Sequence, residues 1–265
     1  MVYVVFLLFS FSSSLIGAIC GIGGGVILKP GLDALGLYDT VTINFLSGCT
    51  VLAMTTYSLL HRLCKRSDTA TEKKEGISLS EMGLSFGAAM GGIAGKSLFH
   101  FCAERMEKAS FMTLLQSMLL FFMVLLVFLY ERYFPIVRKK TAHALYQHLL
   151  IGFGLGLLSS FLGIGGGPIN LLVLKYFYGM GVKQAVKSSL FIVFLSQLFS
   201  FIYTFMTRSF PTVGVQLVLL MIVGGIAGGI VGRGINAKIA DSTVTKLFSV
   251  CNLVIMGICI FNIVR

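Results

Sequence analysis

The chain has 265 residues, of which 56% are hydrophobic and only 12% are charged, and its mean hydropathy is +0.93. Soluble domains carry about 25% charged residues, so this composition excludes a globular protein with an ordinary water-facing surface. The net charge of +11 does not indicate a nucleic-acid partner, because Lys and Arg gather between apolar runs, in Arg62–Lys74 and Arg132–Lys140. Basic residues in such places set membrane topology and contact anionic lipid, so the bilayer is the predicted partner.

Apolar runs of near-spanning length follow one another along the chain. A membrane-spanning helix needs about 20 apolar residues, and continuous rather than alternating runs favour helices over a closed barrel. The predicted fold is therefore an all-α polytopic membrane protein with about eight transmembrane helices, multi-pass in the cell (inner) membrane. The runs are Val2–Ile19, Val41–Leu60, Leu79–Phe99, Phe111–Tyr130, Leu145–Leu162, Ala185–Met206, Val213–Val231 and Val244–Val264.

Two glycine-rich motifs occur twice, in the same order and at similar separation. Gly21-Ile22-Gly23-Gly24-Gly25 recurs at Gly163–Gly167, and Gly91-Gly92-Ile93-Ala94-Gly95 recurs at Gly224–Gly228. A chain rich in glycine produces one such coincidence easily, but two in register indicate an internal duplication. The sequence therefore predicts two four-helix repeats.

The repeats are predicted to cover residues 1–135 and 136–265, and their relative orientation depends on the glycine segments. If each half crosses the membrane four times, the repeats are parallel. The N-terminus then shares a side with the basic stretches Arg62–Lys74 and Arg132–Lys140, which places it in the cytoplasm. If the glycine segment is instead a re-entrant hairpin, the parity changes and the repeats are inverted. The sequence leaves both arrangements open.

The first and second glycine breaks, Gly21–Gly25 and Gly163–Gly167, are predicted to interrupt the first helix of each repeat. Four glycines in five positions do not hold a regular helix, and freed backbone groups in lipid must face protein or a wet cavity. Pro168 suits the first position of a restarting helix. Successive glycine amides and a helix N-terminus make a partly positive concavity that suits an anion. The alternative is close helix packing, which we favour for Gly91–Gly95 and Gly224–Gly228.

Polar residues in the runs also point to an anion. Asp33, Asp39, Glu81 and Asp241 are placed at span ends or in loops, whereas a cation carrier usually buries a carboxylate. Neutral donors are available instead, although each alone is more often a helix–helix hydrogen bond. Lys187 is interpreted as snorkelling to the interface or attracting anions. The candidate substrate-binding residues are Gly21, Gly23, Gly24, Gly25, Asn44, Gly163, Gly165, Gly166, Gly167, Asn170, Ser188 and Ser189.

Catalysis, metals and cofactors are not predicted. The six cysteines show no C-x-x-C pairing, which argues against a disulfide framework or zinc site. A membrane enzyme would need a convergent His, Glu and Asp set, which the apolar runs lack. The phosphate-binding pattern G-x-x-x-x-G-K-[ST] is absent from the sequence, so the chain does not power transport with ATP.

These motifs resemble the sulfite exporter TauE/SafE family of anion permeases. The resemblance rests on the repeated Gly-x-Gly-Gly-Gly motif, on eight spans in two halves, and on Ala185-x-x-Ser188-Ser189-Leu190-Phe191. It covers essentially the whole chain, and the second half fits better than the first. The resemblance implies transport of sulfite, thiosulfate or an organosulfonate, and the residues themselves indicate only a small oxyanion.

Export is the predicted direction, because the membrane potential drives anions out of a negative interior by about 2.3 kcal/mol per charge per 100 mV. One alternative is a transporter or channel of the same fold for another small anion or metabolite. Another is a non-transporting structural subunit, in which replacing Gly24 and Gly166 with alanine changes assembly but not substrate binding.

Overall fold

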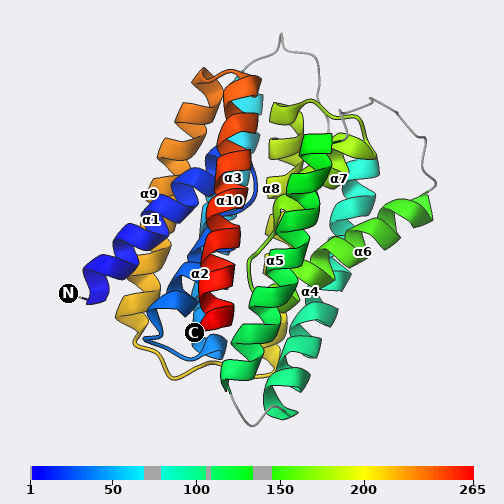
Figure 1. The fold of residues 1–265 in the computed structure, drawn as a ribbon. Coiled ribbons are helices and arrows are strands. Elements are labelled where there is room, and N and C mark those ends of the chain that lie inside the picture. Colours follow the sequence, from blue (N-terminus) through cyan, green and yellow to red (C-terminus); the bar gives the residue numbers. More distant parts are fainter. Residues whose placement is uncertain (1, 69–78, 106–108, 134–144) are drawn as a thin grey trace.

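The computed structural model describes residues 2–68, 79–105, 109–133 and 145–265 (Figure 1). These residues form ten α-helices and no strand. In chain order the helices are α1 (Val2–Cys20), α2 (Gly25–Leu35), α3 (Thr40–Asp68), α4 (Leu79–Arg105), α5 (Ala109–Tyr133), α6 (Leu145–Leu162), α7 (Pro168–Tyr176), α8 (Val182–Met206), α9 (Val215–Lys238) and α10 (Asp241–Val264).

The predicted class, an all-α polytopic membrane protein, is confirmed. Seven of the described helices are long and apolar enough to cross a membrane, namely α1, α3, α5, α6, α8, α9 and α10. The remaining predicted run, Leu79–Phe99, forms most of α4, which is long enough to cross. Two charged residues, Glu81 and Lys96, stand within this run.

Both predicted breaks are present, so the first helix of each half is discontinuous. After α1 ends at Cys20, Gly21 and Gly23 take φ angles of +74° and +73°, and α2 begins at Gly25. After α6, Gly163 and Gly165 take φ angles of +66° and +71°. Glycine adopts this left-handed region without the steric cost that other residues incur. The proline that follows the second break occupies the first turn of α7, as predicted.

Each break turns the chain back on itself, which inverts the second half relative to the first. In Figure 1, α1 rises and α2 descends beside it, whereas α6 descends and α7 rises. The helices α3 and α5 rise, and their counterparts α8 and α10 descend. The re-entrant alternative is therefore the one that the structure adopts, and the parallel arrangement is wrong. The predicted boundary between residues 135 and 136 lies outside the described residues.

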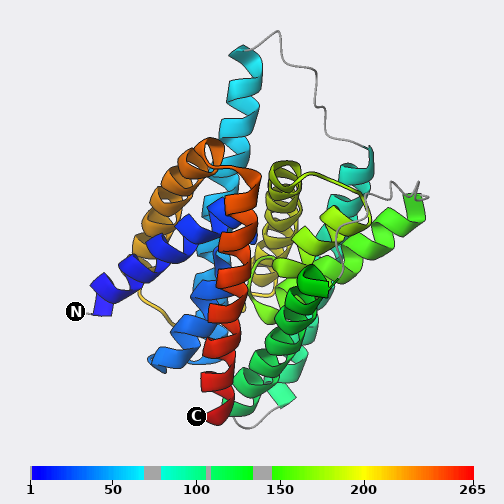
Figure 2. The same cartoon turned by 45° about the horizontal axis from the view of Figure 1, so that its top comes forward.

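The inverted halves pack through their small residues. The helix α1 lies along α9 on one flank, and α6 lies along α4 on the other (Figure 2). A Cβ added to Gly91 would stand 2.0 Å from the Phe153 carbonyl oxygen, and one added to Gly228 would stand 2.2 Å from the Phe11 carbonyl oxygen. Side chains have no room there, so the close-packing interpretation of these glycines is confirmed.

The register of this packing differs from the sequence match by one helical turn. Gly95 faces the Leu157 carbonyl oxygen as Gly232 faces that of Leu15. The sequence offset that places Gly163 on Gly21 also places Leu157 on Leu15. Gly95 is thus the counterpart of Gly232, although its sequence match was to a glycine four residues earlier. Glycines recur every four residues on both helices, so a shift of one turn still aligns them.

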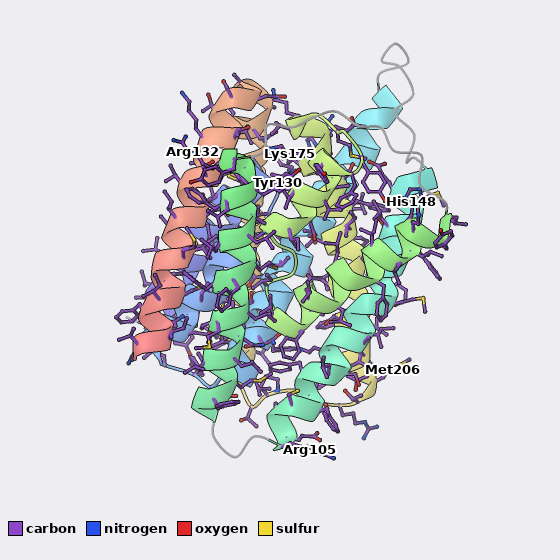
Figure 3. The ribbon with its side chains drawn as sticks, turned by 45° about the vertical axis from the view of Figure 1, so that its right-hand side comes forward. Arg105, Tyr130, Arg132, His148, Lys175 and Met206 are labelled. Atoms are coloured by element: carbon purple, nitrogen blue, oxygen red, sulfur yellow. The ribbon has the colours of Figure 1, made fainter. Side chains whose placement is uncertain are left out.

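The hairpins also change the expected topology. In Figure 3, Arg132 near the end of α5 lies at the top of the bundle, and Arg105 at the end of α4 lies at the bottom. The helices α3 and α9 end at the top, whereas α1 begins and α10 ends at the bottom. The N-terminal end therefore lies opposite the basic stretches. The expectation that they share a side is wrong, because it counted each glycine segment as part of a full crossing.

This arrangement gives a testable topology. The positive-inside rule places the top end, with the basic stretches, in the cytoplasm. A phosphatase reporter fused after Arg265 is expected to be active outside the cytoplasm, and a fluorescent reporter that matures only in the cytoplasm is expected to stay dark there. A bright C-terminal fluorescent fusion with an inactive phosphatase fusion would contradict this orientation.

Candidate functional site

The two glycine breaks meet at the centre of the bundle. A Cβ on Gly23 would stand 3.7 Å from the Gly165 carbonyl oxygen, and one on Gly25 would stand 2.2 Å from the Ile164 carbonyl oxygen. All residues of both breaks are buried. The two hairpin tips, which enter from opposite ends of the bundle, therefore touch backbone to backbone, and this contact needs glycine at Gly25.

Side chains at equivalent positions of α3 and α8 pack against the two breaks. Val51 on α3 lies beside Gly23 and Gly165, and Val193 on α8 occupies the counterpart position beside Gly23 and Gly166. We call the two breaks with Val51 and Val193 the break layer. Its backbone amides are partly used internally, since the Gly21 N–H donates to the Gly17 carbonyl oxygen at 2.8 Å. All residues of the layer are buried, and its backbone and valine side chains are in direct contact, so the layer is closely packed.

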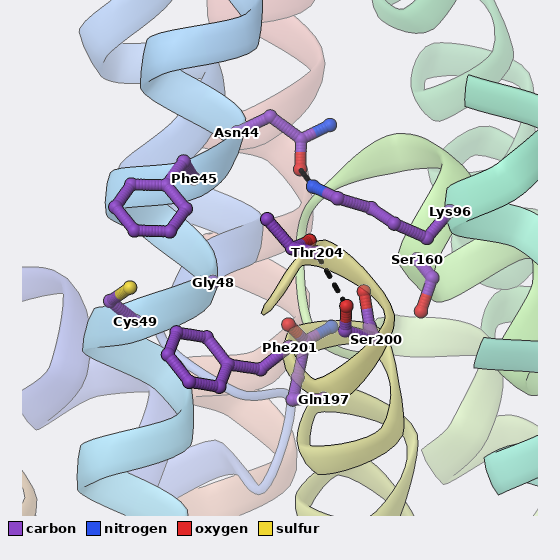
Figure 4. A pocket seen from close by; sticks show the side chains of 10 residues that line it. All are labelled: Asn44, Phe45, Gly48, Cys49, Lys96, Ser160, Gln197, Ser200, Phe201 and Thr204. Atoms are coloured by element: carbon purple, nitrogen blue, oxygen red, sulfur yellow. Dashed lines mark hydrogen bonds between the residues drawn. The ribbon is translucent and has the colours of Figure 1, made fainter. Parts of the chain in front are cut away.

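A pocket lies against this layer, between α3, α4, α6 and α8 (Figure 4). Asn44 links the two features, because a Cβ on Gly163 would stand 2.4 Å from the Asn44 Oδ1 atom. Asn44 is the one predicted site residue that lines the pocket. The residues lining it are Asn44, Phe45, Gly48, Cys49, Lys96, Ser160, Gln197, Ser200, Phe201 and Thr204.

Lys96 supplies the charge of this pocket. Its side chain is 6% exposed, and its Nζ atom donates a hydrogen bond to Asn44 Oδ1 at 3.3 Å (Figure 4). It also lies 5.3 Å from the centre of the Phe99 ring. The ion pairs among the described residues are Lys29–Asp33 and Lys175–Glu131, and neither includes Lys96. A buried ammonium without a carboxylate is costly, so such a residue indicates a site for an anion.

Neutral hydrogen-bond donors beside Lys96 also favour an anion. The Nδ2 atom of Asn44 and the Nε2 atom of Gln197 are buried N–H donors without a hydrogen-bond acceptor in the described part of the chain. A buried donor left unpaired costs about 1–3 kcal/mol. The hydroxyl groups of Ser160 and Ser200 face the same pocket. The pocket thus presents one cation and several donors, which is the complement of a small oxyanion.

The other predicted donors lie around the break layer and outside the pocket lining. Ser189 is fully buried on α8 and its hydroxyl has no partner in the described residues, as is true of Ser47 at the counterpart position of α3. Asn170 is buried on α7 and its Oδ1 atom is also unpaired there. Ser188 donates a hydrogen bond to Glu81. Of the predicted polar residues, Asn44 therefore lines the pocket, whereas Asn170, Ser188 and Ser189 are buried outside its lining.

The carboxylates differ from expectation in their burial. Asp33 was predicted at a span end or in a loop, yet it lies on α2 with its side chain 3% exposed, 2.9 Å from Lys29. Glu81 was also placed at a span end, and it is buried against Ser188. Both carboxylates stand near helix ends, as expected, because Asp33 lies two residues before the end of α2 and Glu81 lies in the first turn of α4, but they are buried rather than exposed. The hairpin brings Asp33 inside, where the lysine one turn earlier neutralises it.

Two further observations concern the lysines. Lys187 is exposed near the start of α8, as the snorkelling interpretation expects. Lys96 was missed by the sequence analysis, although it is the only basic residue in the run Leu79–Phe99. It stands three residues before the end of that run, but α4 continues to Arg105, which leaves the lysine inside.

Comparisons with known proteins agree with this architecture. A family model described as "Sulfite exporter TauE/SafE" matches residues 5–259. The chain is 24% identical to "Probable membrane transporter protein YunE" of Bacillus subtilis (strain 168), over 97% of this chain and 99% of that protein. No solved structure matches the chain. Because the family model spans nearly all of the described helices and both breaks, the chain belongs to the sulfite exporter TauE/SafE family and is a multi-pass membrane transporter.

Proposed function

We propose that this chain is a permease, not an enzyme, that moves a small sulfur-containing oxyanion such as sulfite, thiosulfate or an organosulfonate across the cell membrane. The observation that carries the proposal is Lys96, buried in the pocket without a carboxylate among the described residues and surrounded by neutral donors. A cationic substrate would meet only repulsion from this ammonium.

The chemistry of the pocket fits an oxyanion that has shed part of its water. Sulfite and sulfonate groups present three oxygen acceptors around one sulfur atom. Lys96 offers a charge-assisted hydrogen bond, and the Asn44 and Gln197 amides offer N–H donors that are unpaired in the described residues. These contacts replace hydration, and the pocket lining contains no carboxylate that would repel the anion. The family description supplies the preference for sulfur.

Outward movement follows from the membrane potential. A negative interior favours exit of each negative charge by about 2.3 kcal/mol per 100 mV, so export of a monoanion or dianion proceeds without coupling. Uptake of a dianion would work against about twice that energy. We therefore propose export, with the anion itself carrying the current.

The proposal is tested by tracer uptake into proteoliposomes. The panel contains sulfite, thiosulfate, sulfate, isethionate and nitrate, with potassium and choline as cationic counterparts and protein-free liposomes as the control. Saturable uptake of sulfite, thiosulfate or isethionate, accelerated by an inside-positive potential, is expected. Movement of a cation with no response to any anion would overturn the proposal. Transport of nitrate but of no sulfur anion would favour a permease for other small anions.

A counterflow measurement separates a carrier from a channel. Vesicles preloaded with unlabelled sulfite are expected to accumulate labelled sulfite transiently. A carrier that releases unlabelled sulfite outside returns with labelled sulfite bound, so the label enters faster than it leaves. A channel of the same fold gives no such overshoot.

A further inference from the structure

The inverted halves give the Lys96 pocket a counterpart at the other end of the bundle. Lys96 directly follows Gly95 on α4, and Arg233 directly follows Gly232 on α9. The two glycines are equivalent, because they face the carbonyl oxygens of Leu157 and Leu15 in the same register. Arg233 therefore occupies the position on α9 that Lys96 occupies on α4.

The surroundings of Arg233 match those of Lys96 in kind. Its Nη1 atom donates to the Ser58 carbonyl oxygen at 3.2 Å, and its guanidinium group lies 4.6 Å from the centre of the Tyr57 ring. The offset that places Val193 on Val51 also places Ser200, which lines the Lys96 pocket, on Ser58. Each cation thus lies beside the same turn of the helix α3 or α8.

Arg233 also resembles Lys96 in its charge balance. The guanidinium is half-buried and donates to two backbone carbonyl oxygens, those of Ser58 and Gly229. Neither ion pair seen in the described part of the chain includes it. A guanidinium satisfied only in part by carbonyl oxygens keeps N–H donors for a second ligand, and its planar fork suits two oxygens of one oxyanion.

The two cations lie on opposite sides of the break layer. Along α3, Asn44 and Cys49 of the pocket precede Val51 of the layer, and Ser58 follows it. This helix rises through the bundle in Figure 1, so the Lys96 pocket lies below the layer and the Arg233 region lies above it. The closely packed layer therefore separates two positive regions that the inverted symmetry relates.

We propose that Arg233, with Ser58 and Tyr57, forms a second binding site for the transported oxyanion, on the side of the break layer opposite Lys96. This inference rests on the proposed anion transport. The anion occupies the Arg233 site when the protein is open to the top of the bundle and the Lys96 site when it is open to the bottom. Passage between the sites requires the break layer to open.

The test measures sulfite transport in membrane vesicles of both orientations, which present the top or the bottom face of the bundle to added sulfite. Arg233→Gln is expected to raise the half-saturation concentration about tenfold from the top face, because a charge-assisted contact is lost, with less than about twofold change from the bottom face. Lys96→Gln is expected to show the reverse asymmetry. Arg233→Lys keeps the charge and is expected to restore part of the affinity.

The matched control is Lys238→Gln, which removes an exposed positive charge from the same helix. If Arg233→Gln behaves as Lys238→Gln does from both faces while Lys96→Gln still impairs transport, the second site is overturned and the proposed function stands. If neither Arg233→Gln nor Lys96→Gln changes transport, or the wild-type chain moves no sulfite, the proposed function falls as well. Melting temperatures of the purified variants show whether each one folds. If Arg233→Gln does not fold, the half-saturation concentrations of Arg233→Lys from the two faces test the second site instead.

Discussion

Replacing Lys96 with glutamine is expected to lower sulfite transport from the bottom face of the bundle about tenfold to hundredfold at low substrate concentration. The substitution keeps the length of a polar side chain but removes the buried charge that lies 3.3 Å from Asn44 Oδ1. A hydrogen bond to a charged group contributes about 1.5–3 kcal/mol, which corresponds to that range in affinity. Initial rates of tracer uptake into vesicles that present the bottom face to added sulfite measure the effect.

The stability of this variant distinguishes a binding residue from a structural one. A buried ammonium without a carboxylate partner in the described residues costs free energy when no anion is bound. Lys96→Gln is therefore expected to leave the melting temperature unchanged or raised, while transport falls. Lys187→Gln removes an exposed lysine and serves as the control for lost charge. A variant that melts lower and transports at the wild-type rate once folded would contradict the assigned role.

Replacing Gly91 with alanine is expected to destabilise the protein by about 1–3 kcal/mol, the usual cost of forcing extra atoms into a packed contact. The added methyl group would stand 2.0 Å from the Phe153 carbonyl oxygen, a backbone atom that cannot move without shifting α6. The counterpart change, Gly228→Ala, meets the Phe11 carbonyl oxygen on α1 and is expected to act in the same direction. Thermal unfolding in detergent or lipid nanodiscs measures both.

The chain offers a matched control in Gly154 of α6. A Cβ added there meets no atom within 4 Å. Gly154→Ala is therefore expected to be neutral or to stabilise by up to about 1 kcal/mol, since alanine favours a helix over glycine. Equal melting temperatures for Gly91→Ala and Gly154→Ala would show that the α4–α6 contact is looser than the structure has it.

The sequence was sufficient for the elements whose signal is local. Consecutive apolar residues specify a membrane helix, and a run such as Gly163–Gly167 cannot continue one, so the helices and both breaks could be predicted. Pro168 marked the start of α7 because its missing N–H is harmless at that position alone. The packing role of Gly91 and Gly228 followed from their four-residue spacing.

The direction of the chain after each break could not be predicted. It depends on backbone angles such as those of Gly21 and Gly163, and an apolar pattern reads the same whether a helix continues across or turns back. The parallel arrangement, and the expectation that the N-terminus shares a side with the basic stretches, both failed for this reason. The short helix α2 carried Asp33 inside as a consequence.

The pocket escaped prediction for a different reason. Its lining comes from α3, α4, α6 and α8, which are distant in sequence, and only their packing brings Asn44, Lys96 and Gln197 together. Lys96 alone gives an ambiguous signal, because lysine near a helix end usually snorkels to the interface. Gln197 is one of several neutral polar residues in the apolar runs, and nothing in its local sequence distinguishes it from the others. The glycine motif therefore indicated the centre of the molecule. The position of the Lys96 charge beside it could be found only from the folded structure.

Thermal unfolding with sulfite tests most directly whether the anion binds beside Lys96. The measurement compares the purified wild-type chain with Lys96→Gln over a range of sulfite concentrations. At 100 times its dissociation constant, a ligand that binds only the folded state stabilises it by about 2.7 kcal/mol. We expect sulfite to raise the melting temperature of the wild-type chain, and to raise that of Lys96→Gln less at every sulfite concentration. Equal stabilisation of both proteins would contradict the Lys96 pocket as the binding site.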